Sequence, residues 1–304
     1  MMNPPISEDS NRALEIEIAD LELRLQRAKE RLAKSSSATS QATIPSSPSP
    51  QSAHHYLLLL SDSALPLGSF AFSSGLESYL AHTRQSRLSS STTASSSFSS
   101  FLPLSLASYA STTLPFVLAA HRDPDPWNVA RLDDTLDAAI ICAVGRRASV
   151  AQGRALLSIW EKSIAATVDP QARLRPFAEM LRTSSTTTTT TTSSPTVTDF
   201  PSVSAHLAPL FGAVAALCGL TLRQTSYVFL LSHVKALVSA AVRAGQFGPY
   251  QAQRILAGAE VQGFIEAAVE REWCTEVERA GQSVPVMDLW FGRHELLYSR
   301  IFNS

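Results

Sequence analysis

Three serines in one short stretch are the first residues of this chain that could do chemistry. Ser61, Ser63 and Ser73 lie within LLLLSDSALPLGSFAFSSGLESY at 57–79. A serine hydroxyl becomes a nucleophile when a neighbouring base takes its proton, and Gly-x-Ser-x-Gly after a strand is a common setting for such a serine. The stretch has neither that spacing nor a strand pattern before it. A helical hydrolase that uses one of these serines is therefore an alternative function that lacks a base.

Histidine and cysteine are the next candidates, because their side chains bind transition metals. His54 and His55 are adjacent in an expected linker, where they could touch a metal without enclosing it. The three cysteines are far apart without a Cys-x-x-Cys spacing, which favours buried free thiols over a zinc site; they are Cys142, Cys218 and Cys274. A helical metal carrier that uses His54, His55, His294 and the cysteines is the main alternative function.

The remaining polar clusters favour surfaces over catalysis. Arg146 and Arg147 are adjacent in a helical pattern, where a solvated face is the simpler interpretation. Asp288, His294 and Glu295 lie close together near the C-terminus and fit a polar docking tail better than a general base. No Gly-x-x-x-x-Gly-Lys-Ser/Thr loop occurs in the sequence, so a phosphate-binding loop is not expected. We expect a protein that is not an enzyme and has no cofactor of its own.

The bulk composition narrows the class of protein further. The chain has 304 residues, 45% of them hydrophobic, and a formal net charge of -1 at pH 7. This balance argues against binding to nucleic acid or to a membrane surface. The apolar stretch 203–222 approaches the length of a membrane span, but His206 and Pro209 favour a buried core helix. The N-terminal residues lack the pattern of a secretory signal, so we expect a soluble, cytoplasmic protein.

The elements that must position these side chains are predicted to be helices. Apolar residues recur at steps of three and four, and no stretch alternates with a period of two between turn residues. Asp133 and Asp134 favour a helix start, while glycines mark helix ends. The fold class is all-α, a single helical domain of about eight to ten helices, with the clearest ones at 132–163, 205–219, 224–244 and 249–273 and stop signals at Gly219, Gly245 and Gly248.

The chain divides into an N-terminal extension and a helical domain. Residues 1–53 combine a heptad helix with a Ser/Pro linker at 35–53, and the helix could form a coiled coil or remain a solvated single helix. Its apolar seam consists of Leu14, Ile18, Leu21, Leu25, Ala28 and Leu32. The domain spans 54–304. Ser/Thr-rich insertions near 86–100 and 183–199 interrupt it, and we expect both to be surface loops.

Four blocks of this sequence, in order, resemble the urease accessory protein UreF family. The first is the stretch at 57–79, with its Leu-Pro-Leu-Gly-x-Phe core followed by Ser-x-Gly-Leu-Glu. The others are RRASVAQGRALL at 146–157, LVSAAVRAGQFGPYQAQRIL at 237–256 and MDLWFGRHELLYSRIFNS at 287–304. Together they cover the domain at about 57–304. The N-terminal heptads and the two insertions lie outside the family pattern, which leaves open how the N-terminus affects assembly.

The resemblance implies an all-α, non-catalytic scaffold in urease maturation. UreF-like proteins bind UreD (also called UreH) and recruit the GTPase UreG, and the complex delivers nickel to the urease apoprotein; a homodimer within the complex is also implied. Partner-binding positions that follow from the matched blocks are Phe70, Phe72, Glu77, Arg146, Gln152, Arg154, Gln253, Arg254, His294, Glu295, Tyr298, Arg300 and Phe302. Positions with a structural role in the motif are Leu65, Pro66, Gly68, Ser73, Gly75 and Gly248.

We expect different blocks of the sequence to bind different partner proteins. We expect residues 288–304 to carry much of the UreD contact. We expect Gln253, Arg254 and the Arg146–Arg154 face to contact UreG. The rigid bend at Pro66 and Gly68 leaves two aromatic side chains beside a chain reversal, and either a partner or the core could cover them.

Overall fold

The structure, a computed structural model, describes residues 50–86, 94–168, 173–187 and 203–303. All of them belong to one compact unit, Pro48–Ser304. Within these residues the chain is helical and contains no strand, so the all-α prediction is confirmed. The predicted heptad seam lies outside the described residues. The first described helix begins at Pro50, a few residues before the predicted start of the domain at 54.

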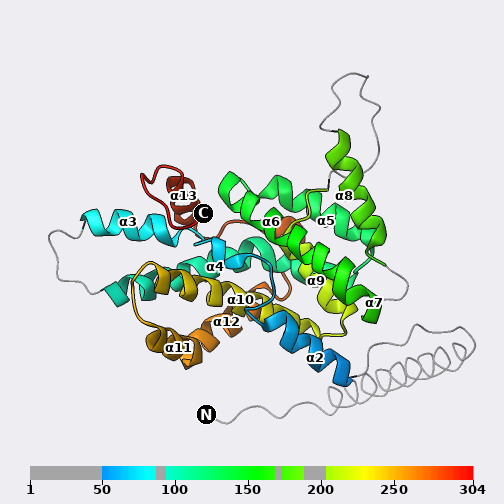
Figure 1. Cartoon of the computed structure of the whole chain (residues 1–304), viewed down its shortest axis with the longest axis horizontal. Coiled ribbons are helices and arrows are strands. Elements are labelled where there is room, and N and C mark those ends of the chain that lie inside the picture. Colours follow the sequence, from blue (N-terminus) through cyan, green and yellow to red (C-terminus); the bar gives the residue numbers. More distant parts are fainter. Residues whose placement is uncertain (1–49, 87–93, 169–172, 188–202, 304) are drawn as a thin grey trace, which may run out of the picture. The chain divides into compact units, whose positions relative to one another are not determined.

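Helices α2 to α13 follow one another along the described parts of the chain (Figure 1). Their bounds are α2 Pro50–Ser61, α3 Leu76–Ser86, α4 Ala94–Arg122, α5 Pro126–Ala139, α6 Ala143–Ile159, α7 Ala165–Val168, α8 Arg175–Thr187, α9 Leu207–Leu217, α10 Leu222–Arg243, α11 Pro249–Ala257, α12 Ala259–Glu272 and α13 Val286–His294. Short turns of other helix types lie at Ser69–Ala71, Trp160–Ile164 and Val277–Arg279.

Helices α4, α9 and α10 form the centre of the domain. α4 packs against α9, α10 and α12, and α6 packs against the other side of α9. Helix α9 is buried almost throughout, as predicted for the apolar stretch 203–222. Two segments, Ser97–Arg122 and Leu222–Arg243, are long and apolar enough to cross a membrane. Most of each segment is buried against other helices of the domain, which is the environment of core helices.

Two predicted helices are divided, so the described part holds more helices than the expected eight to ten. The predicted helix 132–163 breaks between Ala139 and Ala143, where Arg146 donates hydrogen bonds to the carbonyl oxygens of Asp137 and Ile140. The predicted helix 249–273 breaks at Gly258, whose backbone is extended. In both places the backbone changes direction and the helix ends, although the helical spacing of apolar residues continues across the break.

The helix start assigned to Asp133 and Asp134 is wrong. The helix begins earlier, at Pro126, where the Asp125 side chain accepts hydrogen bonds from the backbone N–H groups of Trp127 and Asn128. Proline is favoured at a first helical position and aspartate just before it. Asp133 therefore lies inside α5 and is fully buried.

The predicted stop signals are confirmed at two of the three glycines. Gly219 and Gly245 adopt left-handed conformations with φ near +80° and +69° just after α9 and α10. In each case the next residue's N–H donates back to the helix, which satisfies carbonyl groups at the helix end. Gly248 differs, because its φ is -84° and it precedes α11 as its N-cap.

The first predicted insertion is shorter than expected. Helix α4 begins at Ala94, and Phe98 is buried with its ring centroid 5.1 Å from that of Phe247. A single aromatic residue that reaches the core is enough to extend a helix into a serine-rich segment. At the second insertion, helix α8 continues to Thr187, and the described chain resumes at Val203.

Candidate functional site

The segment between α2 and α3 makes a tight double bend. Gly68 has φ +73° and Gly75 has φ +82°, a region that favours glycine. A Cβ atom on Gly75 would lie 3.2 Å from Cβ of Trp290 on α13, so this turn also needs a small residue for packing. The bend predicted from Pro66 and Gly68 is present, and it places the start of α3 against α13.

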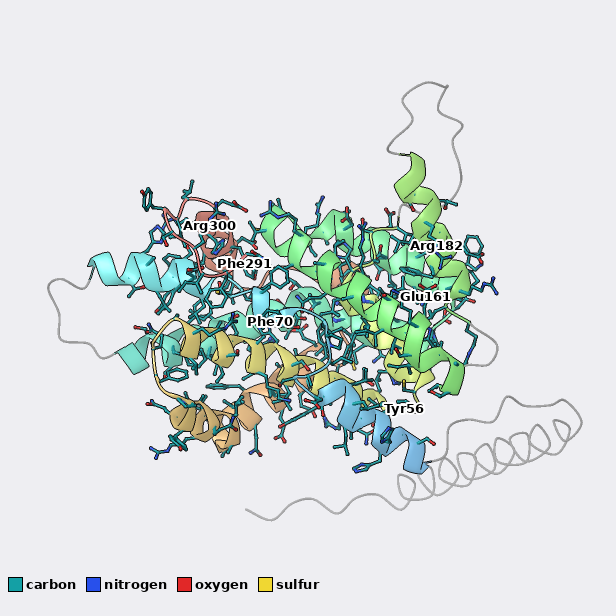
Figure 2. All side chains as sticks on the ribbon, in the orientation of Figure 1. Tyr56, Phe70, Glu161, Arg182, Phe291 and Arg300 are labelled. Atoms are coloured by element: carbon teal, nitrogen blue, oxygen red, sulfur yellow. The ribbon has the colours of Figure 1, made fainter. Side chains whose placement is uncertain are left out.

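The two aromatic side chains of this bend point in opposite directions. Phe70 is 67% exposed, whereas Phe72 is half-buried and lines a cavity beneath the bend. In the view of Figure 2, Phe70 lies near Phe291 of α13 and below Arg300 of the residues that follow α13. One aromatic residue is therefore available to a partner while the other faces the interior.

The carboxylate of Glu77, in the first turn of α3, holds the C-terminal segment. Its Oε1 accepts a hydrogen bond of 2.6 Å from the backbone N–H of Ile301. Its Oε2 accepts from the N–H of Phe302 at 3.2 Å and from Nε2–H of His294 at 3.0 Å. One half-buried carboxylate thus satisfies three donors from a segment more than 200 residues away in sequence. We call this arrangement the Glu77 clamp.

The end of the chain is fixed by further contacts around the clamp. Phe302 is buried, and the guanidinium of Arg243 lies 4.3 Å from the centroid of its ring. Arg243 also donates a hydrogen bond to the carbonyl oxygen of Phe70, and the N–H of Asn303 donates to the carbonyl of Ala71 at 2.8 Å. The C-terminal segment therefore packs along the double bend and joins it to α10.

A row of charges continues the same surface onto α6. Glu295 accepts hydrogen bonds from Arg147 and, at 2.9 Å, from Arg300. These bonds lower the pKa of the Glu295 carboxyl below its usual value, although the side chain is exposed to solvent. Gln152 of the same helix accepts a hydrogen bond of 2.7 Å from the hydroxyl of Ser69. The second sequence block is thereby joined to the first and the fourth.

All four sequence blocks that carry the family resemblance thus meet at one place. The first supplies Glu77, the second Arg147 and Gln152, the third Arg243 and the fourth the C-terminal segment. We call this assembly the tail platform, made of residues 68–77, Arg147, Gln152, Arg243 and 294–303. Its exposed apolar side chains are Phe70, Leu296, Tyr298 and Ile301.

Several predicted partner-binding residues are occupied within the chain in this conformation. Glu77 serves the clamp, while His294 and Phe302 are buried beneath the C-terminal segment. Arg146 joins α5 to α6 through backbone carbonyls, and Arg154 donates to the carbonyl oxygen of Ser204 at 3.2 Å. The assignment of these residues to partners stays a prediction, but their observed contacts are intramolecular.

Gln253 and Arg254 do not join the tail platform. Both are exposed on α11, which packs against α10 and α12. The expected UreG surface therefore divides in two, one part on α11 and another on α6.

A second carboxylate, that of the fully buried Asp133 on α5, holds the turn that leads into α9. Asp133 accepts hydrogen bonds from the backbone N–H groups of Ser204, Ala205 and His206, the residues that lead into α9. Ala205 adopts a left-handed backbone with φ +69°, which this carboxylate holds in place. Gly153 on α6 lies directly against the same turn. The sequence predicted a helix start at Asp133. Its true partners, the backbone N–H groups before α9, lie about 70 residues away and give no local signal.

Sequence analysis also passed over a buried pair of rings beneath the tail platform. His233 on α10 stacks on Tyr109 of α4, with ring centroids 4.0 Å apart and planes within 5°. Nε2 of His233 lies 3.1 Å from the hydroxyl of Ser105. Burial lowers the pKa of His233 to about 3, so the ring is neutral at pH 7. A lone histidine within an apolar helical period gave no signal of this arrangement.

Acidification is expected to destabilise the domain through His233. Because its folded pKa is near 3 and the unfolded value is near 6.5, the unfolded chain binds the extra proton between these pH values. Stability should fall as the pH decreases from 6.5, by about 2 kcal/mol at pH 5, at ~1.4 kcal/mol per pH unit. Urea denaturation at pH 7.5 and 5 would measure this.

The variant His233→Phe should lose this part of the pH dependence and keep a ring for stacking. The matched control is His55→Gln, which replaces an exposed histidine on α2. Equal pH dependence in wild type and His233→Phe would contradict the assignment.

The metal-carrier alternative finds no ligand cluster in the described part of the chain. Among those residues, no group of three or more His, Cys, Asp or Glu side chains could hold a metal ion. His54 and His55 lie within α2 and not in a linker, while His294 is engaged with Glu77. Of the cysteines, Cys218 is buried, Cys142 is half-buried and Cys274 is exposed.

Comparison with known proteins gives a consistent result. A family model described as UreF matches residues 92–260. The chain is 35% identical over 257 residues to a Schizosaccharomyces pombe protein named "Uncharacterized urease accessory protein UreF-like", covering 84% of this chain and 98% of that protein. It is 32% identical to "Urease accessory protein F" of Oryza sativa subsp. indica, covering 80% and 82%, and 31% identical to that of Arabidopsis thaliana, covering 81% and 90%.

Proposed function

Because this chain belongs to the UreF family, we propose that it acts as a non-catalytic scaffold in the maturation of urease. In this proposal it binds UreD and recruits the GTPase UreG, and the complex assists nickel insertion into the urease apoprotein. The names of its relatives as urease accessory proteins support the general role. The specific partners follow from the family resemblance of the four sequence blocks.

The observation that carries the proposal is the tail platform. Its blocks come from four distant parts of the sequence, and their contacts hold the C-terminal segment in one conformation. Four large apolar side chains remain exposed there: Phe70, Leu296, Tyr298 and Ile301. Exposed aromatic and branched residues on a rigid support are typical of protein-binding surfaces. We assign this surface to UreD.

A scaffold role also agrees with the chemistry of the polar groups. Ser73 is buried, and its hydroxyl accepts a hydrogen bond of 3.4 Å from the backbone N–H of Glu77. Ser61 donates to the carbonyl oxygen of Leu58 in the last turn of α2. These two hydrogen bonds serve helix ends, and neither of these two partners is a base that could activate a hydroxyl.

The surface can be tested with side chains that do not contribute to folding. The double variant Phe70→Ala, Tyr298→Ala removes two exposed rings and leaves the Glu77 clamp intact. We expect capture of purified UreD to weaken at least ~10-fold with an unchanged melting temperature, because exposed aromatic anchors often dominate binding energy. Equilibrium pull-down or interferometry would measure it.

The matched control is Tyr250→Ala, which removes an equally exposed tyrosine from α11, away from the platform. UreD capture should stay at the wild-type level in this variant. In the same assay, Arg254→Glu tests whether α11 contacts UreG, read as UreG recruitment by the complex with UreD and as GTP hydrolysis. Wild-type UreD capture by the double variant would refute the assignment of the platform.

A further inference from the structure

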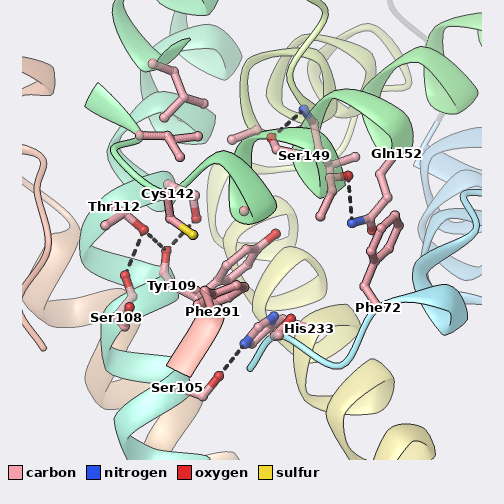
Figure 3. A pocket seen from close by; sticks show the side chains of 18 of the residues that line it. Phe72, Ser105, Ser108, Tyr109, Thr112, Cys142, Ser149, Gln152, His233 and Phe291 are labelled. Atoms are coloured by element: carbon pink, nitrogen blue, oxygen red, sulfur yellow. Dashed lines mark hydrogen bonds between the residues drawn. The ribbon is translucent and has the colours of Figure 1, made fainter. Parts of the chain in front are cut away.

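A cavity of about 410 Å³ lies beneath the tail platform among helices of the domain core and opens to solvent beside the exposed Ile141 (Figure 3). Its walls come from the double bend, α4, α6, α9, α10, α13 and the loop at 280–282. Sites for small molecules occupy roughly 300–1,000 Å³ and combine apolar walls with a few polar groups. This cavity fits that description in both size and composition.

The apolar part of the wall combines aliphatic side chains with several aromatic rings. Phe72 and Phe291 contribute from the double bend and α13, while Phe211 and Phe229 contribute from α9 and α10. Tyr109 and His233 present their stacked rings to the same space, as Figure 3 shows. Flat rings on several sides favour a flat occupant, because offset and edge contacts between rings add to the gain from burial.

Two polar atoms in this wall have no hydrogen-bond partner among the described residues. One is the hydroxyl of Tyr109 and the other is Nδ1 of His233, whose Nε2 is paired with Ser105. Neither atom is fully enclosed by protein, so a molecule in the cavity can reach both. Either tautomer of His233 leaves Nδ1 able to accept or to donate. A polar group left unpaired in an apolar site costs free energy, so an occupant that pairs with these atoms gains affinity.

The charged side chains in the wall indicate which net charge a bound molecule should carry. Among the described residues that line the cavity, the only formally charged side chain is Asp288, whose Oδ1 accepts a hydrogen bond from Gln282 at 3.1 Å. The part of the lining that the structure describes contains no lysine or arginine to pair with an anion. Moving an unpaired charge into such a site is costly, which favours a neutral molecule.

The Ser105–His233 pair supports binding and not nucleophilic catalysis. A general base needs a pKa near the working pH, whereas burial lowers the pKa of His233 to about 3. Nδ1 also lacks the carboxylate that orients the histidine in a catalytic triad. The pair therefore fixes the orientation of the ring and leaves its free nitrogen for a ligand.

We propose that this cavity is a binding site for a neutral, mainly aromatic small molecule that carries a hydrogen-bond donor and an acceptor. Its rings contact Phe72 and Phe291, and its polar atoms pair with Tyr109 and His233. This inference does not depend on the assignment of UreD to the tail platform. The two can fail separately, because one is measured with a small molecule and the other with a protein.

The test uses oxindole as the probe, a neutral bicyclic ring with an adjacent N–H donor and carbonyl acceptor. Its comparator is indole-2-carboxylate, which has a similar ring and a negative charge. Calorimetric titration of the full chain is expected to show saturable oxindole binding, at least tenfold tighter than binding of the anion. Absence of saturable binding up to the solubility limit of oxindole would overturn the proposal.

Cysteine modification locates the bound probe. Cys142 lines the cavity, whereas Cys274 is exposed elsewhere and serves as an internal control. Saturating oxindole should slow alkylation of Cys142 by N-ethylmaleimide several-fold and leave Cys274 unchanged, as followed by peptide mass spectrometry. Equal rates at Cys142 with and without oxindole would place the probe outside the cavity and overturn the proposal.

Matched variants test the two polar atoms. Tyr109→Phe removes the hydroxyl inside the cavity, and Tyr298→Phe removes an exposed hydroxyl on the C-terminal segment. We expect oxindole affinity to fall at least fivefold in the first and to remain unchanged in the second. Ala236→Leu fills part of the space and should abolish binding in a protein whose circular dichroism is unchanged. Wild-type affinity in both cavity variants would refute the site.

Discussion

Replacing Glu77 with glutamine is expected to release the C-terminal segment from the domain. The carboxylate accepts three hydrogen bonds, and a glutamine side chain has one acceptor oxygen and an NH₂ group that must face donors. At least one backbone N–H or the His294 ring then loses its partner, at a cost of about 1–3 kcal/mol. This loss of free energy acts on the short C-terminal segment, so that segment should detach from the domain before the helices unfold.

Hydrogen exchange measures this effect directly. Amides of residues 295–303 should exchange at least tenfold faster in Glu77→Gln, with helices α4, α9 and α10 still protected. UreD capture should decline in parallel if the tail platform is its docking surface. The matched control is Glu278→Gln, which changes an exposed glutamate outside the platform. Unchanged exchange at 295–303 in Glu77→Gln would show that the clamp does not hold the segment.

Among variants that replace one described glycine with alanine, Gly153→Ala should lose the most stability. The new Cβ would lie 2.1 Å from the carbonyl oxygen of Ala205 and 2.7 Å from the backbone nitrogen of Leu207. These backbone atoms belong to a turn whose N–H groups at 204–206 donate to Asp133, and Leu207 N–H donates to Ser149, so they cannot rotate away. Overpacking of this kind costs about 3 kcal/mol. For a domain of this size the melting temperature should fall by roughly 6–12 °C.

Thermal denaturation followed by circular dichroism checks the effect of Gly153→Ala. Gly263→Ala is the control, because it makes the same change on α12 where an added Cβ has no atom within 4 Å. The free energy of unfolding of this control should stay unchanged or increase by up to ~1 kcal/mol, since alanine is the better helix former. A melting temperature for Gly153→Ala within about 2 °C of wild type would contradict the close contact of α6 and α9.

The fold class was predictable because helical periodicity is a local signal. Apolar spacing predicted α9 and α10, and glycines predicted where both end. The breaks after Ala139 and at Gly258 were missed, since each interrupts a helix without changing the apolar period. The buried Phe98 was missed for the opposite reason, because a core contact with Phe247 outweighed a serine-rich composition.

The candidate site was predictable in its residues but not in its geometry. Family resemblance selected Glu77, His294 and Phe302 as partner-binding residues, yet the structure joins them to one another. The clamp unites positions separated by more than 200 residues, and local sequence carries no information about such a pairing. Arg243 illustrates the same limit, because its contacts with Phe70 and Phe302 depend entirely on tertiary packing.

The carboxylate of Asp133 has a consequence for how this domain responds to sequence change. It accepts hydrogen bonds from three consecutive backbone N–H groups at residues 204–206, so the entry to α9 depends on one side chain of α5. Loss of this carboxylate leaves several backbone donors without their partner, at about 1–3 kcal/mol for each buried group. A change at position 133 is therefore felt at the start of α9, about 70 residues further along the chain.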